Sequence, residues 1–129
     1  MLKKICLAAA FGWAGVILYM CLIRISELPA ITIPYLDKAV HAFFYFVFMI
    51  LWFYALRFYY DKQSRKKLLW IVFLLSLVFG IAVELFQNYF TVYRSGDVLD
   101  VLANTTGSLI AILLITTLDK KDFLSKISI

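Results

Sequence analysis

The chain has 129 residues, of which 64% are apolar, 18% aromatic and only 16% charged. This composition leaves too little polar surface to cover a soluble globular domain of this size, so it predicts an integral membrane protein. The net charge of +5 does not indicate nucleic-acid binding, because the basic residues flank apolar segments and no aromatic and basic groove module is present.

Four apolar stretches are long enough to cross a membrane, since a hydrocarbon core of about 30 Å needs about 20 residues of α-helix. They cover residues 5–25, 39–58, 68–90 and 98–118. The connectors between them are too short to fold independently. We therefore expect one domain, residues 1–129, built as an all-α bundle of four transmembrane helices.

The first stretch shares some features with a secretory signal, because Lys3 and Lys4 precede an apolar run. The run continues to Arg24 without a clear small-residue cleavage site, so we interpret it as a retained helix that serves chiefly for packing. Its cysteines, Cys6 and Cys21, lack metal-binding spacing and are expected to be inert core thiols.

The basic residues predict the orientation in the membrane. Most lie at the N-terminus, in the connector after residue 58 and in the C-terminal tail, whereas the other two connectors are mainly acidic. By the positive-inside rule, both termini and the middle connector are cytoplasmic, in a multi-pass protein of the cytoplasmic membrane.

The second and third stretches each carry a polar face. Near the start of the second, Asp37, His41 and Tyr45 repeat every four residues, and Asp37 is expected to cap the helix. In the third, steps of four, four and three residues place polar or small residues on one face that is predicted to meet protein. These are Ser76, Gly80, Glu84 and Gln87.

The fourth stretch repeats this pattern. Asp97, Asp100, Asn104, Gly107 and Ala111 step by three or four residues and share one face. Part of this polarity has a structural explanation, because Asp97 is expected to cap the helix start and Gly107 to allow close packing. We expect the three polar faces to meet in one pocket that is open to the outside of the cell.

The set of polar residues favours a functional interpretation. A charged residue at the centre of a membrane helix costs about 2.5–3.5 kcal/mol on insertion scales, so Glu84 and Asp100 require compensation. A purely structural network is the first alternative, in which Arg94 pairs with Glu84 or Asp100 and pins the helices together. An ion or proton path is disfavoured, because the polar faces stop at Ser76 and Gly107.

The segments "DKAVHAFFYF" from Asp37, "GIAVELFQ" from Gly80 and "RSGDVLDVLANTTGS" from Arg94 resemble, in this order, the three motifs of VanZ-like membrane proteins. Two positions depart from the family pattern: Ala42, where an aromatic residue is usual, and Ala111, where a second glycine is common. The resemblance implies a membrane protein associated with low-level resistance to lipid-bearing glycopeptides such as teicoplanin.

The predicted binding residues combine the polar faces with the positions that match these motifs. They are Asp37, Lys38, His41, Tyr45, Glu84, Gln87, Arg94, Asp97, Asp100 and Asn104. Lys38 and Arg94 would attract a phosphate or carboxylate, and the acidic and amide groups would bond sugar or amide groups.

The leading hypothesis is that the pocket binds the head group of a membrane lipid, a cell-wall precursor or a lipoglycopeptide, with no cofactor, no metal and no nucleic-acid partner. The alternative is a membrane enzyme that acts on a lipid head group. In that case His41 and Glu84 would form an acid-base pair, or His41, Glu84 and Asp100 would hold a metal ion and a water molecule. The chain has no serine-protease-like triad or HExxH signature, which makes an enzyme the second choice.

Overall fold

The structure is a computed structural model and describes residues 2–22, 36–90 and 98–120. Four α-helices account for nearly all of these residues: α1 (Leu2–Leu22), α2 (Leu36–Tyr59), α3 (Arg65–Phe90) and α4 (Val98–Lys120). Each helix is long and apolar enough to cross a membrane. The predicted all-α bundle of four transmembrane helices is therefore confirmed.

The helices extend a little beyond the predicted apolar stretches. The first begins at Leu2, three residues before the predicted start, and residues 23–25 of the predicted stretch lie outside the described residues. Lys3 and Lys4 lie inside this helix. Lysine is tolerated near the end of an apolar helix because its stem can lie along apolar surface while its ammonium group reaches the polar interface. Helix α3 begins at Arg65 because Ser64 caps it, with the Lys67 amide N–H donating to the Ser64 hydroxyl at 3.2 Å.

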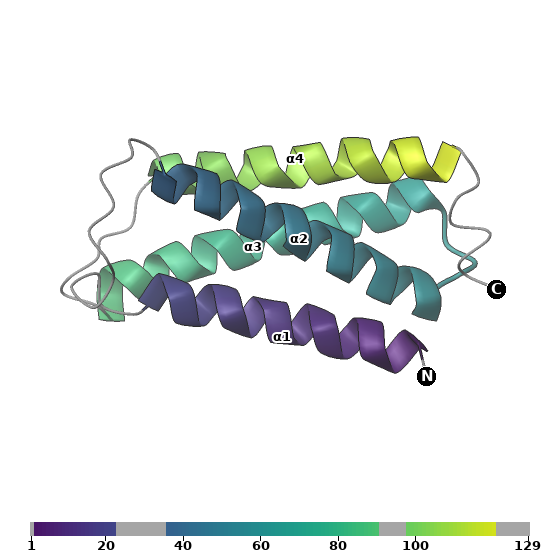
Figure 1. Cartoon of the computed structure of the whole chain (residues 1–129), viewed down its shortest axis with the longest axis horizontal. Helices are drawn as coiled ribbons and strands as arrows, with labels where there is room; N and C mark the ends of the chain where they lie inside the picture. The colour runs from purple at the N-terminus through teal and green to yellow at the C-terminus, as the bar shows by residue number, and fades with distance from the viewer. Residues whose placement is uncertain (1, 23–35, 91–97, 121–129) are drawn as a thin grey trace.

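Helix α2 lies at the centre of the bundle and packs against each of the other three helices (Figure 1). Its contact with α4 is the most extensive of all helix pairs. The two backbones approach closely at Gly107, where an added Cβ would overlap the Ala42 carbonyl oxygen. The predicted close-packing role of Gly107 is confirmed, since only a residue without a side chain fits against this backbone.

Two apolar clusters form the core. One joins α2, α3 and α4 through Met49, Phe53, Leu68, Leu69, Val72, Ala111 and Ile115. The other joins α1, α2 and α3 through Ile17, Cys21, Phe44, Tyr45, Phe48 and Val83. Helix α1 is also attached by Trp13, whose indole N–H donates to the Phe44 carbonyl at 2.8 Å.

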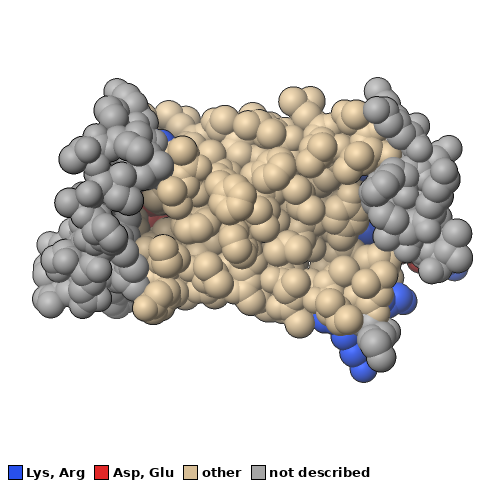
Figure 2. Space-filling model, in the orientation of Figure 1, with Lys and Arg blue, Asp and Glu red and all other residues tan. Residues whose placement is uncertain are grey.

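The outer surface of the bundle is apolar, as expected for helices that face lipid. On the face drawn in Figure 2, Lys, Arg, Asp and Glu come to the surface at the two ends, and a wide band between them carries none. We call the end where α1 and α3 begin the basic end, because Lys3, Lys4, Arg57, Lys62 and Arg65–Lys67 lie there. The opposite end, where α2 and α4 begin, is called the site end.

Candidate functional site

Three ionisable side chains meet inside the bundle near its site end. His41 from α2, Glu84 from α3 and Asp100 from α4 are each less than 8% exposed, and one ligand atom from each lies within 4.8 Å of the other two. His41 Nε2 is 3.9 Å from Glu84 Oε1 and 3.6 Å from Asp100 Oδ2. We call these three residues the charged layer.

The charged layer is shallow because of where its residues lie in their helices. Asp100 is in the first turn of α4 and His41 is in the second turn of α2. Glu84 is six residues before the end of α3, about 9 Å along the helix axis at 1.5 Å per residue. All three are thus within about two helical turns of the site end.

Lys38 completes the electrostatics of the layer. Its Nζ donates to Asp100 Oδ1 at 2.6 Å, and the side chains of Lys38 and Asp100 are 20% and 8% exposed. The two oxygens of Asp100 therefore have different neighbours, since Oδ1 meets Lys38 and Oδ2 faces His41. Among the described side chains, this small space therefore brings together two carboxylates, one ammonium group and one imidazole.

A second polar layer lies one helical turn deeper and contains Tyr45, Gly80 and Asn104. A Cβ added to Gly80 would be 3.0 Å from Asn104 Nδ2 and 3.5 Å from the Tyr45 hydroxyl oxygen, so the missing side chain makes room for both groups. Among the described residues, the Tyr45 hydroxyl and Asn104 Oδ1 have no hydrogen-bond partner, although both side chains are buried. Such groups are rare in native interiors and call for a partner such as water or a ligand.

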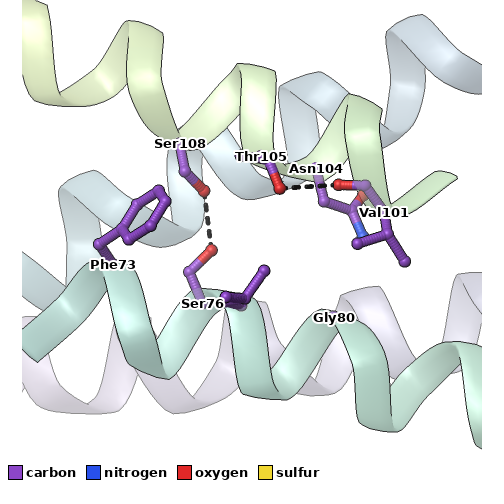
Figure 3. Close-up of a pocket in the computed structure, with 8 residues that line it drawn as sticks. Phe73, Ser76, Gly80, Val101, Asn104, Thr105 and Ser108 are labelled. Carbon is purple, nitrogen blue, oxygen red and sulfur yellow. Dashed lines mark hydrogen bonds between the residues drawn. The ribbon is translucent and has the colours of Figure 1, made fainter. Parts of the chain in front are cut away.

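The third polar layer closes the stack. The hydroxyls of Ser76 and Ser108 lie 2.7 Å apart, joining α3 to α4 (Figure 3). Beside them, Ser76, Gly80, Asn104 and Ser108 border a cavity of about 10 Å³. That volume holds about one water molecule, so this cavity is too small for a lipid head group.

Beyond the serines the bundle is apolar. The next positions toward the basic end include Met49, Phe53, Val72 and Ala111, none of which has measurable exposure. Among the described residues, the stack of buried polar side chains that starts at the site end therefore reaches only as deep as Ser76 and Ser108. The expectation that no ion path crosses the bundle stays a prediction.

Gln87 joins α3 to the end of α1. Its amide nitrogen donates to the Cys21 carbonyl at 2.6 Å, and its side chain is fully buried. Cys21 is in the last turn of α1, where carbonyl groups lack a partner within the helix. The contact gives Gln87 a structural role, and its predicted part in binding stays a prediction.

The remaining predicted site residues have no described side chains. Asp37 lies in α2, and its backbone alone is described, whereas Arg94 and Asp97 fall outside the described residues. Their predicted roles in capping and anion binding, and the pairing of Arg94 with Glu84 or Asp100, remain predictions. The structure thus brings Lys38, His41, Glu84 and Asp100 together, with Tyr45 and Asn104 directly beneath.

Sequence reasoning missed Ser108 and the partner of Lys38. Ser108 follows Asn104 by four residues, so the periodicity of α4 contains the signal that places it in the same stripe. The pairing of Lys38 with Asp100 has no such signal, because the two residues are 62 positions apart in the sequence.

A family model for VanZ/LLP1 matches residues 4–119, which cover all four helices. The chain belongs to the VanZ/LLP1 family. This VanZ/LLP1 chain is also 28% identical over 86 residues to an uncharacterised protein of Schizosaccharomyces pombe. The aligned region is 67% of the chain and 50% of that relative, so the chain spans about half of the relative's length. No solved structure matches the chain.

Proposed function

We propose that this VanZ/LLP1 membrane protein binds the polar head group of a membrane lipid or of a cell-wall precursor at its site end. The observation that carries the proposal is that the buried side chains of His41, Glu84 and Asp100 meet at one end of a membrane bundle, with the partly exposed Lys38 beside them. Charged groups at membrane depth are costly, and they are found where they pair with one another or meet a polar ligand.

The direction of approach follows from the packing. The cavity beside Asn104 holds about one water molecule, so it gives a head group no way in between α3 and α4, and we propose that the head group approaches from the site end. Lys38 is the most exposed member of the group at 20%, and its ammonium group suits a phosphate or carboxylate. Asp100 and Asn104 supply acceptors for hydroxyl or amide groups.

The orientation and location form part of the same proposal. The basic residues at the opposite end support a cytoplasmic basic end and an outward site end in the cytoplasmic membrane. In that orientation the site meets lipid head groups and wall precursors of the outer leaflet. Binding of such a molecule, or of teicoplanin itself, would give low-level resistance to teicoplanin-type glycopeptides.

Drug susceptibility tests the proposal directly. We expect a glycopeptide-sensitive host that expresses the protein to become less susceptible to teicoplanin than the same host with an empty vector, and to change less toward vancomycin. The Asp100→Asn variant should lose the effect because it removes the charge that pairs with Lys38. Thr106→Val, which changes an exposed residue of α4, is the matched control and should keep it.

Expression must be compared in the membrane fraction before the susceptibilities are interpreted. Equal teicoplanin susceptibility with and without well-expressed wild-type protein would reject the resistance function. Direct binding of lipid extracts to the purified protein then decides whether head-group binding survives without resistance.

The second candidate is an enzyme that modifies a lipid head group. It is favoured by the positions of His41 and Glu84, which lie 3.9 Å apart and suit acid-base chemistry. Lipid profiles of cells that express the wild type, Glu84→Gln or His41→Ala separate the candidates. An enzyme changes the profile only in the wild type, whereas a binding protein leaves all three profiles alike.

A further inference from the structure

The charged layer has the composition of a metal site. One imidazole nitrogen and two carboxylates converge from three different helices, and each residue offers one ligand atom within 4.8 Å of the others. We propose that His41, Glu84 and Asp100 bind one Zn²⁺ ion. The proposal departs from the leading expectation that the pocket holds no metal and takes up the metal-binding alternative that the sequence had left open for the same three residues.

The distances support this ligand set. Ligand atoms around a tetrahedral zinc ion at about 2.0–2.2 Å are about 3.4 Å apart. His41 Nε2 lies 3.6 Å from Asp100 Oδ2 and 3.9 Å from Glu84 Oε1. The ligand atoms of Glu84 and Asp100 also lie within 4.8 Å of each other, so we propose that rotations of side chains close the site.

The charge of the layer also favours a cation. Among the described side chains, the carboxylates of Glu84 and Asp100 outnumber the one ammonium group, that of Lys38. A dication reverses this excess and takes the position between the two carboxylates. The competing arrangement is a protonated His41 that bridges the carboxylates without any metal.

The surroundings of the layer supply a second, independent indication. Metal-bound carboxylates are usually held by hydrogen bonds from neighbouring groups, and Lys38 holds Asp100 Oδ1 while Oδ2 is directed at His41. Beneath the layer, the Tyr45 hydroxyl lies within electrostatic reach of Glu84, is 99% buried as a residue and has no hydrogen-bond partner among the described residues. Its O–H is therefore an unused donor one helical turn below the layer.

The types of ligand select the metal. Zinc accepts imidazole together with carboxylates, and sites with three protein ligands keep a position open for water or substrate. Magnesium is a poor candidate because it prefers oxygen ligands in an octahedron. The open position here would take a phosphate or carboxylate oxygen of the head group, and this last step rests on the proposed function.

Metal content and metal-dependent stability test the zinc site. The protein is purified with an affinity tag that contains no histidine, stripped with chelator and reloaded with Zn²⁺ or Mg²⁺. We expect about one zinc per chain, a melting temperature that rises with Zn²⁺ and falls again with chelator, and little response to Mg²⁺. Binding of Co²⁺ should give the visible absorption of a low-symmetry nitrogen and oxygen site.

Variants locate the ion. His41→Gln, Glu84→Gln and Asp100→Asn should each weaken zinc binding by more than about tenfold, because the loss of a group that only hydrogen-bonds a metal ligand already costs about 10–100-fold. Ser108→Ala, which changes a buried polar residue of α4 two turns from Asp100, is the matched control and should bind zinc like the wild type. Helical circular dichroism of each variant shows that it is folded.

The outcomes separate this inference from the proposed function. Folded wild-type protein that binds no zinc, or three variants that bind it like Ser108→Ala, would overturn the metal site and leave a protonated His41 as the bridge. Zinc binding without any lipid binding or change in teicoplanin susceptibility would sustain the metal site and remove the head-group function.

Discussion

The closest approach between two helices gives the sharpest structural prediction. Helices α2 and α4 meet where Gly107 lies against the backbone of Ala42, and a Cβ at Gly107 would overlap the Ala42 carbonyl oxygen and lie 2.7 Å from its carbonyl carbon. In Gly107→Ala the two helices would have to separate by roughly 1–2 Å at this point, because packed interiors have no free volume to absorb a methyl group.

The size of the effect follows from what the added methyl group meets. Overpacking in a core costs about 1–3 kcal/mol, and a rigid backbone partner places Gly107→Ala in the upper half, at about 2–3 kcal/mol. Replacing glycine by alanine also favours the helix by up to about 1 kcal/mol. Gly15→Ala is the matched control, since a Cβ there meets nothing within 4 Å and carries the same helix-forming gain.

Unfolding of both variants in mixed detergent micelles, followed by circular dichroism, measures the difference. We expect Gly107→Ala to be less stable than Gly15→Ala by about 2–3 kcal/mol, the overpacking term that remains once the shared gain cancels. The separation of α2 from α4 should also weaken the Lys38–Asp100 ion pair. Equal stability of the two variants would refute the close contact and the α2–α4 packing built on it.

Two further predictions concern the ends of the bundle. Gln87→Leu removes the donor to the Cys21 carbonyl and should lower the free energy of unfolding by about 1–3 kcal/mol in the same assay. Stability equal to that of the wild type would contradict this contact between α3 and α1. A reporter domain that is active only in the cytoplasm should be active both when it is fused after Lys120 and when it is placed in the connector between α2 and α3. An exported reporter at either position would reverse the proposed orientation.

The sequence alone determined the number of spans and, for α2, α3 and α4, the face that meets protein. The predicted all-α class and the four membrane-length helices are confirmed, because hydrophobic length and periodicity act within a single helix. The same holds for the stripes, since Ser76, Glu84, Asp100 and Asn104 are all buried. The resemblance to VanZ-like proteins rested on motifs along the chain and is confirmed by the family match over residues 4–119.

Only the tertiary structure decided which polar groups touch. Lys38 pairs with Asp100, and Gln87 bonds the end of α1. The pattern of polar and apolar residues within one helix does not determine how far that helix is rotated or shifted along its axis relative to its neighbours. One residue of offset moves a side chain by about 1.5 Å along the axis and about 100° around it, enough to make or break a hydrogen bond. The close contact at Gly107 fixes those offsets between α2 and α4, and with them the partners at the site end.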